Sequence, residues 1–338
     1  MNRFSYLRAG NIGEAVSALA SDPAAQIIAG GTNLVDLMKY NVTKPSLVVD
    51  INGLPLRGIE TLDDGGFRIG ALVSNSQIAY NKEIEEHCPM LASAILAGAS
   101  PQLRNAATTG GNLLQRTRCY YFYDPSTPCN KREPGSGCSA IGGVNRIHAI
   151  LGARASCIAT HPSDMCVALA ALDAVVEVQG PDGARDIAFA DFHRLPGDAP
   201  ERDNTLASGE MVTAVRVPAN GFGENHTYLK LRDRLSYAFA LVSVAAGIEI
   251  EHGTIRRVSV AMGGVAHKPW RNPQAEQALV GEPVDGANFE AFADALLSGA
   301  KGQGHNDFKI PLARKTVLRA LAQAVAGTPQ IQAEKAIR

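Results

Sequence analysis

The chain has 338 residues, of which 46% are hydrophobic and 19% charged, and a formal net charge of −1. This length exceeds one ordinary hydrophobic core, so we expect a globular protein of two or three lobes. Dispersed Lys and Arg argue against nucleic-acid binding, and the absence of a long apolar run argues against a membrane span. The first residues lack the apolar core of a signal peptide, so this chain alone is expected to be cytoplasmic.

Helix and strand signals alternate over the first two thirds of the chain. Amphipathic or Ala-rich periodicity predicts helices over 10–21, 32–40, 74–79, 90–100 and 163–174. Runs rich in β-branched residues predict strands over 25–29, 45–53, 65–73, 174–180 and 209–217. Thr32 or Asn33 is expected near the start of the second helix, since both residue types favour helix caps. These segments predict a mixed α and β fold.

The last third of the chain has a different pattern. Two long apolar strands flank the sequence EHGT over 238–265, which predicts a β-hairpin. Helices are then expected over 288–300 and 310–327. A Pro- and Gly-rich stretch near 218–224 precedes this part, so we expect a lobe boundary there.

Two glycine-rich segments indicate a nucleotide-type ligand. The first comprises Ala29, Gly30, Gly31, Thr32, Asn33 and Leu34, and the second comprises Thr108, Thr109, Gly110, Gly111 and Asn112. Paired glycines allow backbone N–H groups to approach a diphosphate, and a following helix start adds partial positive charge. Neither segment matches the Rossmann or Walker patterns, and a lone GG after a strand is usually a turn. Two such segments with similar Thr and Asn chemistry favour one extended ligand held from both sides.

Four of the six cysteines, Cys119, Cys129, Cys138 and Cys157, lie in a segment rich in Gly, Pro and Ser. This composition predicts a long loop, and such loops in compact domains are usually functional or disordered. Four thiolates suit an iron–sulfur cluster or zinc, although the wide spacings weaken zinc, which usually uses a short CxxC pair. Disulfides and free thiols are the other possibilities. Cys166 lies in an apolar helical run and is expected to be a small buried hydrophobe.

Five segments together resemble one family. AGGTNLVDLMK, LRNAATTGGNLLQ, HPSDMCVALAALDA, GEMVTAVRVP and GGVAHKPWRNPQAEQALVG occur in the order typical of the FAD-binding medium subunits of molybdenum hydroxylases, the xanthine dehydrogenase group. The cysteine-rich insertion resembles the FAD subunit of bacterial periplasmic aldehyde oxidoreductases, whose extra loop binds a [4Fe–4S] cluster. The resemblance covers nearly the whole chain.

The resemblance implies an α+β fold: two FAD-binding subdomains of the vanillyl-alcohol-oxidase (PCMH) type and a C-terminal α+β domain. The expected bounds are 1–57, 58–222 with an insertion at 116–160, and 223–338. Residues Ala29 to Leu34 would hold the FAD diphosphate, and Thr108 to Asn112 would form the second wall. Asp164 would accept a hydrogen bond from an FAD hydroxyl group, unless it is an ordinary carboxylate of a first helical turn.

Three further expectations concern single residues. Lys230 would lie near the flavin, with an exposed surface lysine as the alternative. The four cysteines of the insertion would ligate the [4Fe–4S] cluster. His161 precedes a proline and is interpreted as a loop or packing residue, outside the site.

The implied function is electron transfer through FAD. A large molybdopterin subunit would oxidise an aldehyde or N-heterocycle, and a small subunit with two [2Fe–2S] clusters would supply electrons, in a heterotrimer or its dimer. Such a complex could reach the periplasm through a signal on a partner subunit. Two alternatives are a self-sufficient FAD oxidoreductase with its own substrate and a zinc-stabilised, non-catalytic scaffold.

Overall fold

The N-terminal lobe is a small parallel sheet, because a helix follows each of its first two strands and provides the crossover that parallel strands need. The computed structural model describes residues 1–219 and 221–329. The elements of this lobe are β1 (Ser5–Arg8), α1 (Ile12–Ser21), β2 (Gln26–Ile28), α2 (Leu34–Lys39) and β3 (Leu47–Asp50). The sheet order is β1-β3-β2, with both pairs parallel.

The second lobe contains a five-stranded antiparallel sheet with the order β4-β5-β8-β6-β7. Its strands are β4 (Ile59–Thr61), β5 (Phe67–Gly70), β6 (Val175–Gly180), β7 (Gly183–Ala188) and β8 (Met211–Val217). Its helices are α3 (Asn75–Ala79), α4 (Lys82–His87), α5 (Pro89–Ala97), α6 (Pro101–Ala106), α7 (Thr109–Leu113), α9 (Asp164–Ala171) and α10 (Phe189–Phe192). The late strand β8 lies between β5 and β6, so the chain on both sides of the cysteine-rich insertion builds one sheet.

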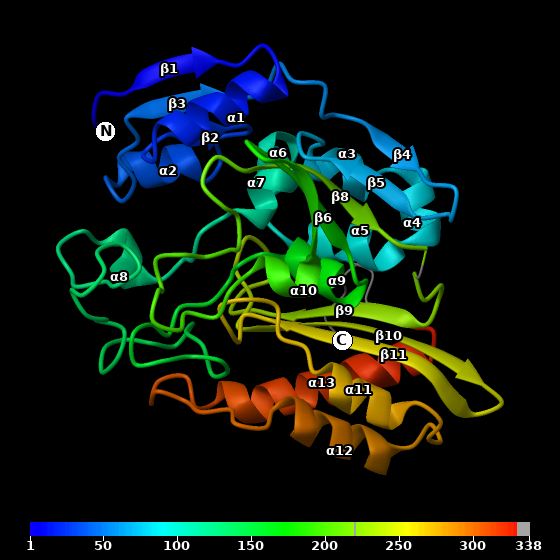
Figure 1. The fold of residues 1–338 in the computed structure, drawn as a ribbon. Coiled ribbons are helices and arrows are strands. Elements are labelled where there is room, and N and C mark those ends of the chain that lie inside the picture. The colour runs from blue at the N-terminus through cyan, green and yellow to red at the C-terminus, as the bar shows by residue number, and fades with distance from the viewer. Residues whose placement is uncertain (220, 330–338) are drawn as a thin grey trace.

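The C-terminal lobe has a three-stranded antiparallel sheet and three helices (Figure 1). The sheet order is β11-β10-β9, with β9 at His226–Leu231, β10 at Val242–Glu251 and β11 at Thr254–Gly263. The helices α11 (Pro273–Leu279), α12 (Gly286–Leu296) and α13 (Lys309–Val325) cover one face. Helices α5 and α9 of the second lobe pack against the other face.

Burial on both faces explains the long apolar runs in β10 and β11. Along β10, Val244 and Ala246 enter the core beneath α13, whereas Ala245 enters the core of the second lobe. The same alternation places Leu229 of β9 in the first of these cores and Tyr228 in the second. The two lobes therefore share a core through this sheet.

The structure confirms the main predicted elements. The helices predicted at 10–21, 32–40, 74–79, 90–100 and 163–174 appear as α1, α2, α3, α5 and α9, and the predicted hairpin appears as β10 and β11. Strand β9 was not predicted, because its sequence HTYLKL mixes polar and apolar residues. The predicted all-loop insertion needs a small correction, because α8 (Tyr120–Tyr123) forms one helical turn within it.

The cysteine-rich insertion is ordered by packing against the C-terminal lobe. Backbone amides of Ile150 and Leu151 both donate to the carbonyl of Val265, at 2.9 and 3.0 Å. Their side chains join the apolar core beneath α13. Among the residues with described positions, no helix has both the length and the apolarity needed to cross a bilayer.

Candidate functional site

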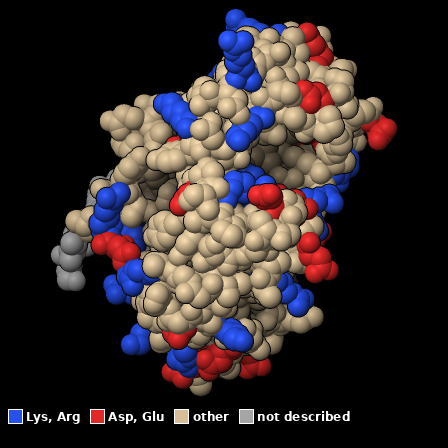
Figure 2. All heavy atoms as spheres, turned by 90° about the vertical axis from the view of Figure 1, so that its left-hand side faces the viewer, with Lys and Arg blue, Asp and Glu red and all other residues tan. Residues whose placement is uncertain are grey.

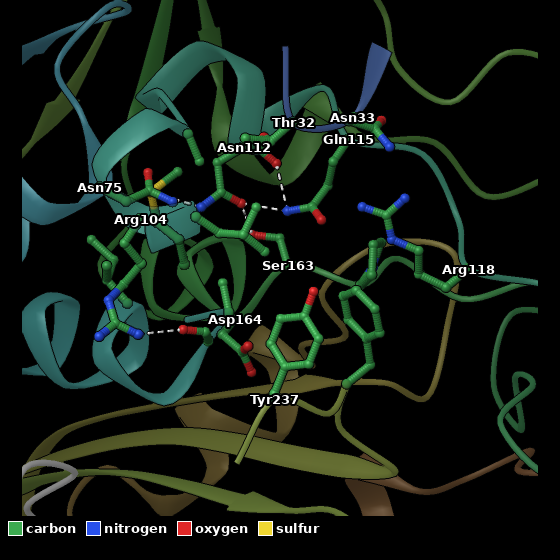
Figure 3. A pocket seen from close by; sticks show the side chains of 18 of the residues that line it. Thr32, Asn33, Asn75, Arg104, Asn112, Gln115, Arg118, Ser163, Asp164 and Tyr237 are labelled. Atoms are coloured by element: carbon green, nitrogen blue, oxygen red, sulfur yellow. Dashed lines mark hydrogen bonds between the residues drawn. The ribbon is translucent and has the colours of Figure 1, made fainter. Parts of the chain in front are cut away.

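A cavity of about 650 Å³ lies where the three lobes meet. Thr32 and Asn33 reach it from the N-terminal lobe, and Asn112 and Asp164 reach it from the second lobe. Tyr237 approaches from the loop between β9 and β10 (Figure 3). Phe239 of the same loop also lines the cavity. Basic side chains are visible around the hollow between the upper and lower halves of the molecule in Figure 2. A second cavity of about 540 Å³ shares Thr32, Asn33 and Gly111 as walls with the first.

The first glycine segment, predicted from sequence, lines the second cavity along its whole length, from Ala29 to Leu34. A Cβ atom on Gly30 would lie 1.8 Å from the carbonyl oxygen of Ala106, so this glycine allows the segment to pack on the end of α6. Gly31 has a φ of 71°, which side-chain-bearing residues rarely adopt. In the described chain, the amides of residues 31–34 donate to no protein acceptor. These amides are available to an anionic ligand.

Asn33 stands at the start of α2, as predicted, but it does not cap that helix. Its Oδ1 atom instead accepts a hydrogen bond from the amide of Arg116 at 3.0 Å. Its Nδ2 group is buried and has no partner within the described chain. A buried unpaired donor costs about 1–3 kcal/mol, so a polar ligand in the cavity would stabilise this arrangement.

The second glycine segment faces the first across the 540 Å³ cavity, with Thr108, Gly110 and Gly111 in its lining. Its amides differ from those of the first segment because they already have protein partners. Thr109 and Gly110 donate to the carbonyls of Val73 and Ala71, at 2.9 Å each, and the Gly111 amide donates to the Thr108 hydroxyl at 3.3 Å. The segment therefore supplies a close-packed wall.

Thr109 differs in position from the other residues of the second glycine segment, and its contact with FAD stays a prediction. The Thr109 side chain is buried, its hydroxyl donates to the carbonyl of Val73 at 3.0 Å, and it lines neither cavity. Thr109 therefore anchors the segment to the backbone of Val73 and does not face a cavity. Asn112 does face the 650 Å³ cavity, where its Oδ1 accepts from Gln115 and from Ser163 (Figure 3).

Asp164 and Lys230 form a buried ion pair on the wall of the 650 Å³ cavity. Lys230 Nζ lies 2.8 Å from Asp164 Oδ2 and 3.1 Å from the carbonyl oxygen of Ala97. Lys230 is only 2% exposed, so the alternative of a surface lysine is wrong. Asp164 is the first residue of α9, as the sequence indicated. Its hydrogen bond with an FAD hydroxyl group stays a prediction.

Tyr228 completes this pair and was missed by the sequence analysis. Its hydroxyl donates to Asp164 Oδ1 at 2.6 Å. Burial, with the neighbouring Asp164 charge, raises the pKa of Tyr228 well above its ordinary value, so the residue stays a neutral donor. The only available sequence signal is the spacing of two residues between Tyr228 and Lys230. Both side chains point to the same face of β9 because side chains alternate along a strand.

The four cysteines of the insertion lie around one small internal space, together with Phe122 and Ala140. Cys119, Cys129 and Cys157 are buried and Cys138 is partly exposed. All six cysteines of the described chain are free, so the disulfide alternative is not what the structure shows. No three of these four sulfurs lie all within 4.8 Å of one another.

The structure places His161 and Cys166 away from this space. The His161 ring packs on the ring of His193, with centroids 4.3 Å apart, and both side chains are buried. Cys166 is fully buried in α9. The interpretation of His161 as a packing residue and of Cys166 as a buried hydrophobe agrees with these positions.

Comparison with known proteins defines the class. Residues 2–220 match the family described as the FAD binding domain in molybdopterin dehydrogenase, and residues 226–324 match the CO dehydrogenase flavoprotein C-terminal domain. The chain therefore belongs to the FAD-binding subunits of the molybdopterin dehydrogenases. This membership confirms the predicted α+β FAD-binding fold, the FAD cofactor and the function as an oxidoreductase subunit.

The similarity extends to individual proteins. The aldehyde oxidoreductase FAD-binding subunit PaoB of Escherichia coli strain K12 is 50% identical over 325 residues, covering 96% of this chain and 99% of that one. The xanthine dehydrogenase FAD-binding subunit of Escherichia coli O157:H7 is 26% identical, covering 95% and 96%. A carbon monoxide dehydrogenase structure from Hydrogenophaga pseudoflava superimposes with a TM-score of 0.75 at 26% identity, covering 96% and 98%.

Proposed function

We propose that this chain is the FAD- and [4Fe–4S]-containing electron-transfer subunit of a molybdenum-dependent aldehyde oxidoreductase. The observation that carries the proposal is that one chain contains both a pair of connected cavities and a separate cluster of cysteines. Cavities bounded by the two glycine segments meet at Thr32, Asn33 and Gly111, and four buried or half-buried cysteines surround a separate space. Similarity to an aldehyde oxidoreductase subunit over the whole chain supports the aldehyde class.

The residues present fit an FAD molecule that extends through both cavities. The unpaired amides of residues 31–34 and the orphaned Nδ2 of Asn33 would bind the diphosphate, and Gly110 and Gly111 stand in the opposite wall. The ion pair of Asp164 and Lys230 would lie beside the flavin end. When bound, FAD accepts electrons from one-electron donors and passes them on singly or in pairs. The chain's own part is to hold the ring and limit its access.

We expect Gly31→Val to weaken FAD binding by about tenfold or more. The left-handed backbone at Gly31 costs a side-chain-bearing residue about 1–2 kcal/mol, and 1.4 kcal/mol is a factor of ten. A shift of the segment relieves this strain and moves the free amides away from the cavity. Flavin content and FAD titration measure the effect.

The matched control for Gly31→Val is Gly253→Val. Gly253 has a φ of 79° in the remote turn between β10 and β11, with nothing near its missing side chain. It carries similar strain and should retain FAD. Full FAD binding in Gly31→Val would remove the first glycine segment from the site.

The four cysteines suit a four-thiolate centre, because they lie around one internal space within the insertion. No short CxxC pair occurs among them, and structural zinc sites usually contain one, so we favour an iron–sulfur cluster. Lys131 lines the same space as the four cysteines and supplies positive charge beside an anionic centre.

The partners of this chain follow from its class. Its relatives are FAD subunits of aldehyde oxidoreductase and xanthine dehydrogenase and a medium chain of carbon monoxide dehydrogenase. We infer a large molybdopterin subunit that oxidises the substrate and a small [2Fe–2S] subunit that delivers electrons to this chain. The substrate pocket would then lie on the large subunit, which predicts no aldehyde turnover by the isolated chain.

Anaerobic purification with cofactor analysis tests the proposal. About one FAD, four irons and four sulfides per chain are expected from one [4Fe–4S] centre. FAD with zinc, or FAD without metal, would overturn the cluster assignment and leave the flavin function standing. Aldehyde oxidation by the isolated chain would favour the self-sufficient flavoenzyme instead.

Cys138→Ser is expected to lose most of its iron and sulfide while FAD content stays near that of the wild type. A serine hydroxyl replaces the thiolate that a cluster iron requires, whereas Cys138 lines neither flavin cavity. Iron, sulfide and flavin are assayed on the same sample. Cys88→Ala is the control, because Cys88 is a buried free cysteine outside the insertion. Four irons retained in Cys138→Ser would exclude Cys138 as a ligand.

A further inference from the structure

His148 faces the cysteine site from within the insertion. Its Nε2 atom lies 3.1 Å from the Sγ atom of Cys119. The side chain is 1% exposed, so water does not compete for this contact. The remaining ring nitrogen, Nδ1, is buried and has no partner within the described part of the chain. The contact with Cys119 is therefore the one polar interaction that orients this ring.

The direction of this hydrogen bond follows from the chemistry of the ligand. A cysteine bound to iron is a thiolate and carries no proton to donate. The proton between the two atoms must then belong to His148 Nε2. In this tautomer the imidazole is neutral, and the positive end of its N–H dipole points at the sulfur.

The C-terminal lobe holds His148 in this position. The carbonyl oxygen of His148 accepts from Asn306 Nδ2 at 3.1 Å and from Lys309 Nζ at 2.8 Å. Asn306 and Lys309 are both fully buried, at the start of α13. The amide of His148 donates to the carbonyl of Asn145 at 3.0 Å. Hydrogen bonds therefore hold both the carbonyl and the amide of His148 in place.

We propose that His148 is a positioning residue that donates a hydrogen bond to the Cys119 thiolate and thereby raises the reduction potential of the iron–sulfur cluster. Reduction adds negative charge to the cluster, and an N–H donor at a ligand sulfur stabilises the more negative state. The inference rests on the proposed [4Fe–4S] centre and adds a residue that sets its potential. Asn306 and Lys309 make this setting depend on the docking of the C-terminal lobe.

The experiment compares His148→Leu and His148→Gln in the complete FAD- and iron-loaded chain. Leucine removes the donor, and glutamine restores an N–H donor on a flexible side chain. The cluster's midpoint potential is measured by redox titration with electron paramagnetic resonance, together with iron, sulfide and FAD content. His226→Leu is the control, because His226 is a buried histidine of the C-terminal lobe whose ring contacts the Gly223 carbonyl, away from the four cysteines.

We expect His148→Leu to bind iron with a lowered cluster potential, and His148→Gln to recover much of the wild-type value. An unchanged potential in His148→Leu, or an equal shift in both variants, would overturn the proposal. If His148→Leu loses its iron, recovery of iron in His148→Gln supports the donor function and loss in both overturns it. Wild-type iron and sulfide content tests the cluster itself, so its failure is distinguishable from failure of the His148 inference.

Discussion

Asp164→Ala is expected to destabilise the protein by about 3–5 kcal/mol, the usual consequence of leaving one member of a buried ion pair without its partner. The side chain of Lys230 is 1% exposed, so its ammonium group cannot recover solvation in the folded state. The Tyr228 hydroxyl also loses its acceptor at this position. Chemical denaturation of the FAD-free and FAD-loaded protein measures the loss.

Two companion variants make this prediction specific. Asp294→Ala removes the carboxylate of a surface pair with Arg314, where Asp294 is 61% exposed, and should destabilise the protein far less than Asp164→Ala, because solvent screens an exposed pair. The double variant Asp164→Asn, Lys230→Met keeps an acceptor for Tyr228 and leaves no charge, so it should be more stable than Asp164→Ala. Equal stability of Asp164→Ala and Asp294→Ala would show that the buried pair contributes little.

Asp203→Ala is expected to cause the second largest loss of stability. It should also make the cysteine-rich insertion less firmly held. Asp203 binds Lys131, which lies between Cys129 and Cys138 and is 3% exposed, and it binds Arg116 at 2.7 Å. Asp203 itself is 27% exposed. The loss of folding free energy should therefore be smaller than for a fully buried pair, where it is about 3–5 kcal/mol. Unfolding free energy and the rate of iron loss to a chelator measure the two consequences.

The ion pairs of Asp203 also predict that the stability of the protein depends on pH. Although burial opposes ionisation, Lys131 and Arg116 hold the pKa of the Asp203 carboxyl well below its ordinary range. A lowered folded-state pKa gives stability that is fully present above about pH 4, the ordinary aspartate pKa, and is lost as pH falls further. Asp203→Ala should lack this part of the acid dependence. Asp198→Ala, at an exposed carboxylate of the same segment, is the control. A wild-type-like rate of iron loss in Asp203→Ala would contradict the anchoring role.

Local patterns in the sequence predicted most of the helices and strands. Helix α1 begins after Asn11, whose side chain accepts from the Glu14 amide, and such caps depend on residues three apart. The two long strands of the hairpin were predictable because their apolar runs meet at a short turn with Gly253 at positive φ. Strand β9 was missed because its residues become a strand only by pairing with β10.

The parts of the candidate site that the sequence indicated are mostly runs of consecutive residues with related chemistry. Both glycine segments line the cavities, and Asp164 and Lys230 face the same space. The sequence does not show that Thr109 faces away from the cavities, because only the fold brings its hydroxyl to the carbonyl of Val73. His148 gave no signal beyond its place between Cys138 and Cys157, and a lone histidine in a loop is usually a packing residue.

The sequence by itself determined the class of the protein, because that class is defined by short segments that occur in a fixed order. The tertiary structure decided which groups are paired and which are free. Asp164 meets Tyr228 and Lys230 across more than sixty residues, and His148 is held by residues at the start of α13. The physical reason is that burial and hydrogen bonding depend on distances in space, which a linear pattern does not contain. The amides of residues 31–34 are free for a ligand only because the folded chain provides them with no other acceptor.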